Sequence, residues 1–228
     1  MNKQQLSISS LSVASLLLLA SPVTQAYEQG DWLVRGRIIN VSPTETSSAV
    51  SIGGVGAIPG SGVGVSDDTT VELDFTYMLH QNWGVELILG SSRHDVPAEG
   101  SIAALGDIID FRTLPPTLTL QYHFRPDGDF RPYVGVGVNY TYFFDEQVTG
   151  GLDGPGAKVK MDDSWGLAAQ IGADYKINDD WFVNFDAKYI DIETTAHFKN
   201  SAPGGVTSYK VDVDADPWVF GIGIGTRF

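Results

Sequence analysis

Hydrophobic and polar residues alternate along most of the chain with a period of two, which is the pattern of β-strands. In residues 71–79, for example, Val71, Leu73 and Phe75 alternate with Glu72 and Asp74. Seven further segments follow the same rule. The pattern therefore predicts eight strands, over residues 32–38, 71–79, 83–90, 117–124, 134–142, 165–175, 181–189 and 218–228.

The composition of the two strand faces indicates where the strands lie. Each apolar face is about five residues long and carries Trp, Tyr or Phe toward its ends. A tilted strand of about ten residues with such a face crosses a bilayer, whereas the apolar face of a soluble sandwich packs against a second sheet. The opposite faces are rich in Gly, Ala, Thr, Ser and Asn, which suit the crowded interior of a small barrel.

The connections between the predicted strands alternate in length. Short links over residues 80–82, 125–130 and 178–180 alternate with long ones near residues 43–68, 93–112, 145–161 and 193–213. Outer-membrane barrels have short periplasmic turns and long external loops, whereas a soluble lipocalin-like barrel predicts no such alternation. We therefore expect an all-β fold, an eight-stranded antiparallel transmembrane β-barrel in a bacterial outer membrane.

The first residues have the features of a secretory signal peptide. Lys3 provides a positive charge, residues 11–20 form an apolar stretch, and Thr24, Gln25 and Ala26 form a small-residue cleavage site. The apolar stretch is shorter than the roughly 20 residues that a membrane anchor needs. We expect residues 1–26 to be removed and residues 27–228 to form a single barrel domain.

Composition narrows the classes of function. The 228 residues include 28 acidic and 14 basic side chains, for a net charge of −14, and no Cys. This acidity argues against nucleic-acid binding, and the lack of Cys excludes disulfides and thiol chemistry. The Gly-rich run 53–64 has no following Lys, so it predicts an external loop rather than a phosphate site. We expect no metal site, because no metal-ligand spacing is found among His80, His94, His123 and His197. We also expect no cofactor and no enzyme activity; a lipid-modifying barrel with a His–Ser contact between loops is the alternative.

Charged residues occupy inward positions of several predicted strands. Unpaired charges inside a narrow barrel are costly, so pairing into a network that blocks water and ions is expected, and an ion path is the alternative. The predicted members are Arg35, Arg37, Glu72, Asp74, Glu86, Asp174, Asp186, Lys188 and Arg227.

Acidic clusters lie at the bases of the predicted external loops, and two interpretations remain open for them. The carboxylates either hold divalent cations that bridge lipopolysaccharide phosphates or are solvated ends of strands. The clusters are Asp67-Asp68, Asp145-Glu146, Asp162-Asp163, Asp191/Glu193 and Asp212/Asp214/Asp216.

Apolar residues share this inward face, either as ordinary packing or as the lining of a ligand chamber. Pro115 and Pro116 also stand out, because proline has no N–H to donate to a sheet and can leave the barrel wall unpaired. The six apolar candidates are Leu33, Ile88, Phe143, Phe182, Ile190 and Val219.

Five stretches of the chain resemble the OmpW family of outer-membrane proteins, and the resemblance covers essentially all of residues 27–228. They are LPPTL (114–118), RPYVGVGVNYTYFFD (131–145), DSWGLAAQIG (163–172), YIDIETTA (189–196) and DPWVFGIGIGTRF (216–228). The resemblance implies a narrow, partly apolar lumen that passes small hydrophobic molecules, which leave sideways through the wall. It also leaves a second possibility, a structural or recognition barrel with a sealed lumen, linked to stress or to phage and colicin binding. The expected partners are outer-membrane lipid, lipopolysaccharide, the barrel-assembly machinery and a small hydrophobic ligand.

Overall fold

The computed structural model describes residues 26–53, 55–200 and 208–228. Its regular structure is almost entirely β-strand, with two short 3-10 turns, η1 (Ala103–Leu105) and η2 (Gly150–Leu152). Within these residues, no helix is both long and apolar enough to cross a membrane. The all-β prediction is confirmed.

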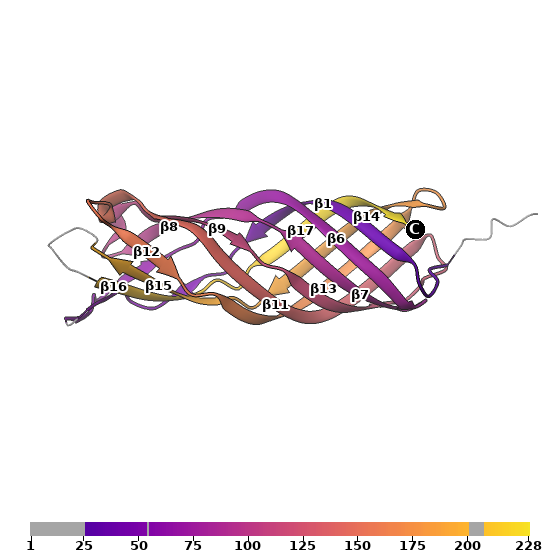
Figure 1. The fold of residues 1–228 in the computed structure, drawn as a ribbon, viewed down its shortest axis with the longest axis horizontal. Coiled ribbons are helices and arrows are strands. Elements are labelled where there is room, and N and C mark those ends of the chain that lie inside the picture. Colours follow the sequence, from indigo (N-terminus) through magenta and orange to yellow (C-terminus); the bar gives the residue numbers. More distant parts are fainter. Residues whose placement is uncertain (1–25, 54, 201–207) are drawn as a thin grey trace, which may run out of the picture.

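Eight long strands form a closed antiparallel ring (Figure 1). Each of these eight strands pairs with the next of the eight along the chain, as β10 does with β11. The first and last of them, β1 and β17, pair with each other and close the ring. In ring order the strands are β1 (Trp32–Ser42), β6 (Asp68–His80), β7 (Trp83–Gly90), β10 (Thr117–His123), β11 (Phe130–Val148), β13 (Ser164–Lys176), β14 (Trp181–Ile190) and β17 (Trp218–Arg227).

The alternation predicted from the sequence sets which side chains face the lumen. Val71 and Leu73 are exposed on the outside, whereas Glu72 and Asp74 are buried inside. Aromatic residues pair at both ends of this apolar outer surface. Near the periplasmic turns the pairs are Trp32–Tyr77 and Trp83–Tyr122, and at the other end they are Tyr140–Trp165 and Tyr189–Trp218. Two aromatic girdles around an apolar band are the mark of a barrel that spans a bilayer.

The long connections are also largely β-structure, which the sequence analysis did not predict. Their strands extend the barrel beyond the girdle at the external end (Figure 1), and β11 alone runs for 19 residues. The extension forms because alternate residues of these segments are apolar and pack inside it, as Val96, Phe111 and Val211 do. Its other strands are β2 (Thr46–Ser47), β3 (Ser51–Ile52), β4 (Gly56–Ala57), β5 (Ser61–Val63), β8 (Ser92–Gly100), β9 (Asp107–Leu114), β12 (Lys158–Met161), β15 (Glu193–Lys199) and β16 (Ser208–Asp214).

Candidate functional site

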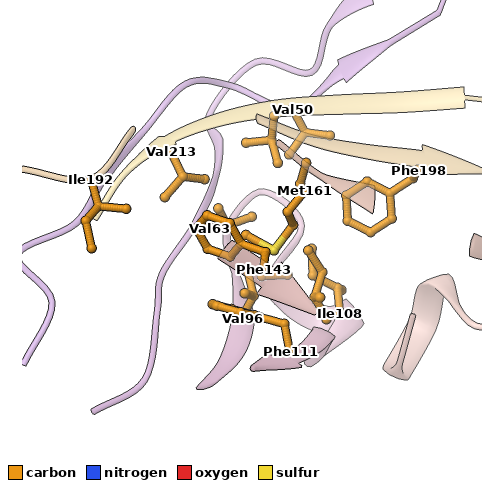
Figure 2. Close-up of a cluster of buried hydrophobic side chains, with 14 of the residues drawn as sticks. Val50, Val63, Val96, Ile108, Phe111, Phe143, Met161, Ile192, Phe198 and Val213 are labelled. Carbon is orange, nitrogen blue, oxygen red and sulfur yellow. The ribbon is translucent and has the colours of Figure 1, made fainter. Parts of the chain in front are cut away.

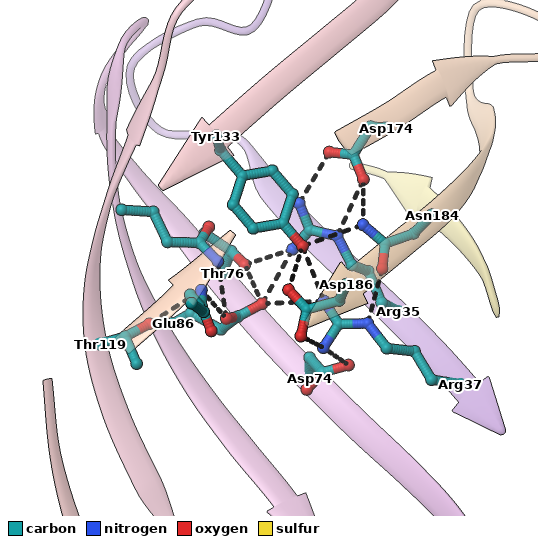
Figure 3. Close-up of polar contacts among 12 residues, drawn as sticks. Arg35, Arg37, Asp74, Thr76, Glu86, Thr119, Tyr133, Asp174, Asn184 and Asp186 are labelled. Carbon is teal, nitrogen blue, oxygen red and sulfur yellow. Dashed lines mark hydrogen bonds and ion pairs between the residues drawn. The ribbon is translucent and has the colours of Figure 1, made fainter. Parts of the chain in front are cut away.

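The inward charges of the barrel meet in one buried network (Figure 3). On strand β1, the Nη2 atom of Arg35 lies 2.8 Å from Asp174 Oδ2, and its Nη1 atom lies 3.1 Å from Glu86 Oε1. Two residues further on, Arg37 Nη1 lies 3.0 Å from Glu72 Oε1. Because inward positions on a strand are two residues apart, both guanidinium groups of β1 reach into the same lumen.

The remaining charges complete the network. Arg37 Nη1 also lies 3.1 Å from Asp74 Oδ2. Lys188 Nζ lies 2.5 Å from Glu72 Oε1 and 3.0 Å from Asp186 Oδ1. All these side chains are buried. Thus eight of the nine predicted charges come together. Arg227 is the exception, because it lies at the periplasmic end of β17, with Nη1 3.6 Å from Asp31 Oδ2.

Neutral side chains, which the sequence analysis did not select, fill the space around these charges. Tyr133 donates its hydroxyl hydrogen to Asp186 Oδ2 at 2.8 Å, and Asn184 Nδ2 donates to Asp174 Oδ1 at 2.7 Å. Gln121 Nε2 donates to Glu86 Oε2 at 2.6 Å. The alternation in the sequence places these three residues on the inward face, but it does not distinguish them from residues that only fill the lumen. Together with the charges they form one buried, hydrogen-bonded network in the lumen.

A small apolar cluster lies on the periplasmic side of this network. It contains Tyr27, Leu33, Met78 and Phe182, all buried. The Tyr27 hydroxyl donates to Asp174 Oδ2 at 2.8 Å, which joins the cluster to the charges. Leu33 and Phe182 face inward as predicted, but they do not share a chamber with the other four lining candidates. Their inward phase is set by alternation, whereas their distance along the barrel axis is set by strand register.

An apolar cavity lies on the external side of the charge network, and we call it the chamber. Ile88, Phe143, Ile190 and Val219 line it, and the Glu72 carboxylate belongs to its lining as well. The extension contributes further apolar residues to its wall (Figure 2), among them Val63, Val96, Phe111, Met161 and Val213.

A second apolar cavity, which we call the outer cavity, lies in the external extension. It has a free volume of about 330 Å³ and is lined by residues from all four long connections, among them Ile58, Leu105, Leu152 and Phe198. The outer cavity and the chamber follow one another along the same strand. On β15, Ala196 lines the chamber and Phe198, the next inward residue, lines the outer cavity.

The barrel wall beside the chamber is interrupted. The β7–β10 ladder ends at the pair Ile88–Thr117, and the β8–β9 ladder begins at the pair Ser92–Thr113. Between these two pairs, three residues on each side, 89–91 and 114–116, do not pair with each other across the wall. Leu89 and Gly90 still pair with β6, and Leu114 still pairs with β11. Gly90, one of these residues, lines the chamber.

The two prolines lie in this interruption, between β9 and β10. Neither has an N–H to donate toward β7, and both carbonyls are held by β11 on the other side. The Tyr140 N–H donates to Pro116 O at 3.1 Å, and Asn139 Nδ2 donates to Pro115 O at 3.2 Å. The wall is therefore joined on the β11 side and unpaired on the β7 side.

The acidic clusters make local contacts at the bases of the extension. Asp67 accepts a hydrogen bond from Ser42 Oγ at 3.2 Å, and Asp68 accepts one from the Arg93 N–H at 2.9 Å. In the part of the chain that the structure describes, no group of three or more His, Asp or Glu side chains is placed to hold a metal ion. Asp67 and Asp68 thus bind the ends of neighbouring strands through these hydrogen bonds.

Comparisons with known proteins agree with this architecture. The profile of the OmpW family matches residues 28–228. The chain is 39% identical to outer membrane protein W of Vibrio cholerae over 220 residues, which is 95% of this chain and 97% of that protein. It is 31% identical over 221 residues to the dibenzothiophene metabolism operon protein PahQ of Pseudomonas aeruginosa, covering 95% of this chain and 96% of that protein. The crystal structure of OprG from Pseudomonas aeruginosa matches with a TM-score of 0.82 and 39% identity, over 89% of this chain and 98% of that one. The chain therefore belongs to the OmpW family of outer-membrane β-barrel proteins.

Proposed function

We propose that this barrel lets small hydrophobic molecules cross the outer leaflet and enter the bilayer sideways. A molecule would bind in the outer cavity, move down to the chamber and leave through the interrupted wall beside Gly90 and Pro115. The observation that carries the proposal is the position of the chamber. It lies between an apolar cavity and a salt-bridged network, and at its side are the two segments of the wall that do not pair with each other.

The charge network supports a sideways route over an axial one. A hydrophobic molecule that moved along the axis would have to separate ion pairs such as Arg35–Asp174, at 2.8 Å, in the barrel interior. Removing one partner of a buried ion pair costs several kcal/mol because the other charge is left uncompensated. Passage through the wall separates no ion pair. The same network argues against general porin activity.

The chamber is narrow, with a free volume of about 70 Å³. A protein cavity that holds benzene has a volume of about 150 Å³, so side chains of the chamber must rotate to let an aromatic hydrocarbon pass. Met161 lines the chamber, and its unbranched side chain adapts readily to irregular space. The name of PahQ also favours an aromatic cargo, since dibenzothiophene is a small, hydrophobic, aromatic compound.

Uptake of naphthalene tests the proposal. Cells with and without the protein would be compared, after a polar dye has shown equal integrity of their outer membranes. We expect faster entry with the protein and loss of this gain in Ile88→Asp, which puts a carboxylate into the chamber where Ile88 is now 3% exposed. Ile88→Val is the matched control and should keep the gain. Equal entry with and without a correctly inserted protein would refute transport and favour a recognition barrel whose external extension does the binding.

A cross-link across the wall tests the sideways exit. The chain has no Cys, so a pair introduced as Gly90→Cys and Pro115→Cys would be the reactive thiols of the protein. Oxidation to a disulfide, or a short bis-methanethiosulfonate linker that forms a disulfide with each thiol, should stop naphthalene entry, and a reductant should restore it. Val85→Cys with Leu120→Cys joins two residues already paired in the ladder, so the same treatment should not change entry. Unchanged entry through a linked Gly90–Pro115 pair would rule out this exit.

We also propose that the chain reaches the outer membrane by export and assisted insertion. Removal of residues 1–26 as a signal peptide would leave Tyr27 as the first residue. Tyr27 is buried among barrel residues, so the residue after the proposed cleavage point already belongs to the barrel. Outer-membrane lipid and lipopolysaccharide would surround the apolar band, and the barrel-assembly machinery would insert it. Mass measurement of the mature protein tests the cleavage point.

A further inference from the structure

A chain of three hydrogen-bonded side chains lies on the wall of the chamber. Ser92 and His94 are two residues apart on β8, so both face inward, and Thr113 on β9 is the register partner of Ser92. Thr113 Oγ1 lies 2.8 Å from Ser92 Oγ, which lies 2.8 Å from His94 Nε2. His94 Nδ1 lies 2.6 Å from the carbonyl oxygen of Ser66. All three side chains line the chamber.

The Ser66 carbonyl at one end of this chain of hydrogen bonds decides which atom donates in each of them. The Ser66 carbonyl can only accept, so His94 Nδ1 carries a hydrogen. His94 lies in the extension, beyond the end of β7, and burial lowers the pKa of its imidazole, so the ring is neutral near neutral pH. Nε2 is therefore an acceptor and Ser92 donates to it. The Ser92 oxygen in turn accepts the hydrogen of Thr113. Both hydroxyl hydrogens are used within the protein, and lone pairs of both oxygens remain.

Four threonine hydroxyls of the chamber follow the same rule, because each of the four donates its hydrogen to an oxygen of the protein. These bonds are Thr70 to Ser91 O at 2.9 Å, Thr117 to Pro115 O at 3.0 Å, Thr141 to Asn139 Oδ1 at 2.7 Å and Thr194 to Asp162 O at 2.7 Å. Glu72, which also lines the chamber, accepts from Arg37 and Lys188. Six hydroxyls and a carboxylate thus offer the chamber acceptors.

We infer that the chamber prefers neutral hydrophobic molecules that carry one hydroxyl group, such as alcohols and phenols, over the parent hydrocarbon and over carboxylates. This inference rests on the proposed function and names its substrate class. A hydrocarbon would strip water from the oxygens of Thr113 and Ser92 without replacing its hydrogen bonds, whereas a hydroxyl group donates to one of them. A carboxylate brings a negative charge and further acceptors toward Glu72, so it is repelled.

The experiment compares naphthalene, 1-naphthol and 1-naphthoate, which share a ring system and differ in the polar group. Entry of each compound would be measured in porin-deficient cells with and without the protein. The difference between the two rates, which is the protein-dependent entry, would be compared among the three compounds. One net hydrogen bond corresponds to about a threefold to tenfold change. We expect wild type to favour 1-naphthol and disfavour 1-naphthoate. Thr113→Val keeps the shape but removes the oxygen, so the ratio of 1-naphthol entry to naphthalene entry should fall by about this factor. Thr113→Ser should keep the preference.

The outcomes separate this inference from the function on which it rests. If none of the probes enters faster with the protein, the proposed function itself fails. If naphthalene entry depends on the protein but Thr113→Val leaves the ratio of 1-naphthol to naphthalene unchanged, the hydroxyl preference is wrong and transport stands. Ser92→Ala is a second variant in case Thr113→Val does not fold. It frees the Thr113 hydrogen to donate, so entry of the ketone 1-tetralone should rise relative to 1-naphthol, and no rise would also contradict the inference.

Discussion

Replacement of Arg37 by Met should destabilise the barrel strongly, and the damage should come mainly through Asp74. Arg37 is buried with its guanidinium near four carboxylates. Three of these have a second cation at hand, because Lys188 contacts Glu72 and Asp186, and Arg35 contacts Glu86. Asp74 is different. Among the described residues, neither of its carboxylate oxygens has a hydrogen-bond partner, and its ion pair is with Arg37 Nη1 at 3.1 Å.

The expected size of the effect follows from this asymmetry. Leaving one buried charge without its partner costs about 3–5 kcal/mol, so Arg37→Met should lower the free energy of unfolding by about that amount. Asp74→Asn in the Arg37→Met background removes the stranded charge and should recover about 2 kcal/mol, within the usual range of coupling between contacting residues. The recovery is incomplete because Arg37 Nε also donates to Asn184 Oδ1 at 2.6 Å, and that bond stays lost.

Urea unfolding in phospholipid vesicles, followed by tryptophan fluorescence, measures these differences. The five Trp residues report insertion; Trp32 and Trp165, for example, face the lipid with 47% and 74% of their surface exposed. Arg112→Met is the matched control, because this side chain is half exposed in the extension and lies 3.9 Å from its partner Asp145. It should change stability by no more than about 1 kcal/mol. An Arg37→Met barrel as stable as this control, or no recovery with Asp74→Asn, would refute the reasoning.

Three further changes test other parts of the structure. A Cβ at Gly223 would lie 2.1 Å from the Gly36 carbonyl oxygen, so Gly223→Ala should abolish the heat-shifted gel band of the folded barrel, whereas Gly36→Ala, with 3.8 Å of room, should keep it. Phe143→Ala widens the chamber and should speed naphthalene entry, whereas Phe182→Ala, on the other side of the charge network, should leave entry unchanged; equal effects would contradict the separation of the two clusters. Because burial lowers the pKa of His94, the folded state disfavours its charged form, so stability should fall as the pH drops from about 7.5 to about 5.5, through the unfolded pKa of about 6.5. The pH dependence of urea unfolding should shrink in His94→Gln, and an identical dependence in both proteins would contradict this assignment.

The sequence alone predicted the parts of the fold that depend on local alternation. Successive side chains of a strand point to opposite faces, so residues such as Arg35 and Ile88 could be assigned to the lumen without a structure. The same alternation, together with the lengths of the connections, predicted the number of strands and the membrane location. The sequence predicts loops for the long connections, whereas the structure shows paired strands there. The reason is that pairing between distant segments leaves a weaker local signal in the sequence than a lipid-facing stripe does.

Tertiary structure alone decided the height of each residue along the barrel axis and the contacts between distant segments. Leu33 and Ile88 have the same inward phase, yet the stagger of the strands places them on opposite sides of the charge network. Arg227 shares that phase and lies too close to the periplasmic end to join the network. The chain of contacts from Thr113 through His94 to Ser66 crosses three segments whose register no local pattern specifies. The period of two determines the face of the wall, whereas the register of the closed ring determines the position of each residue along it.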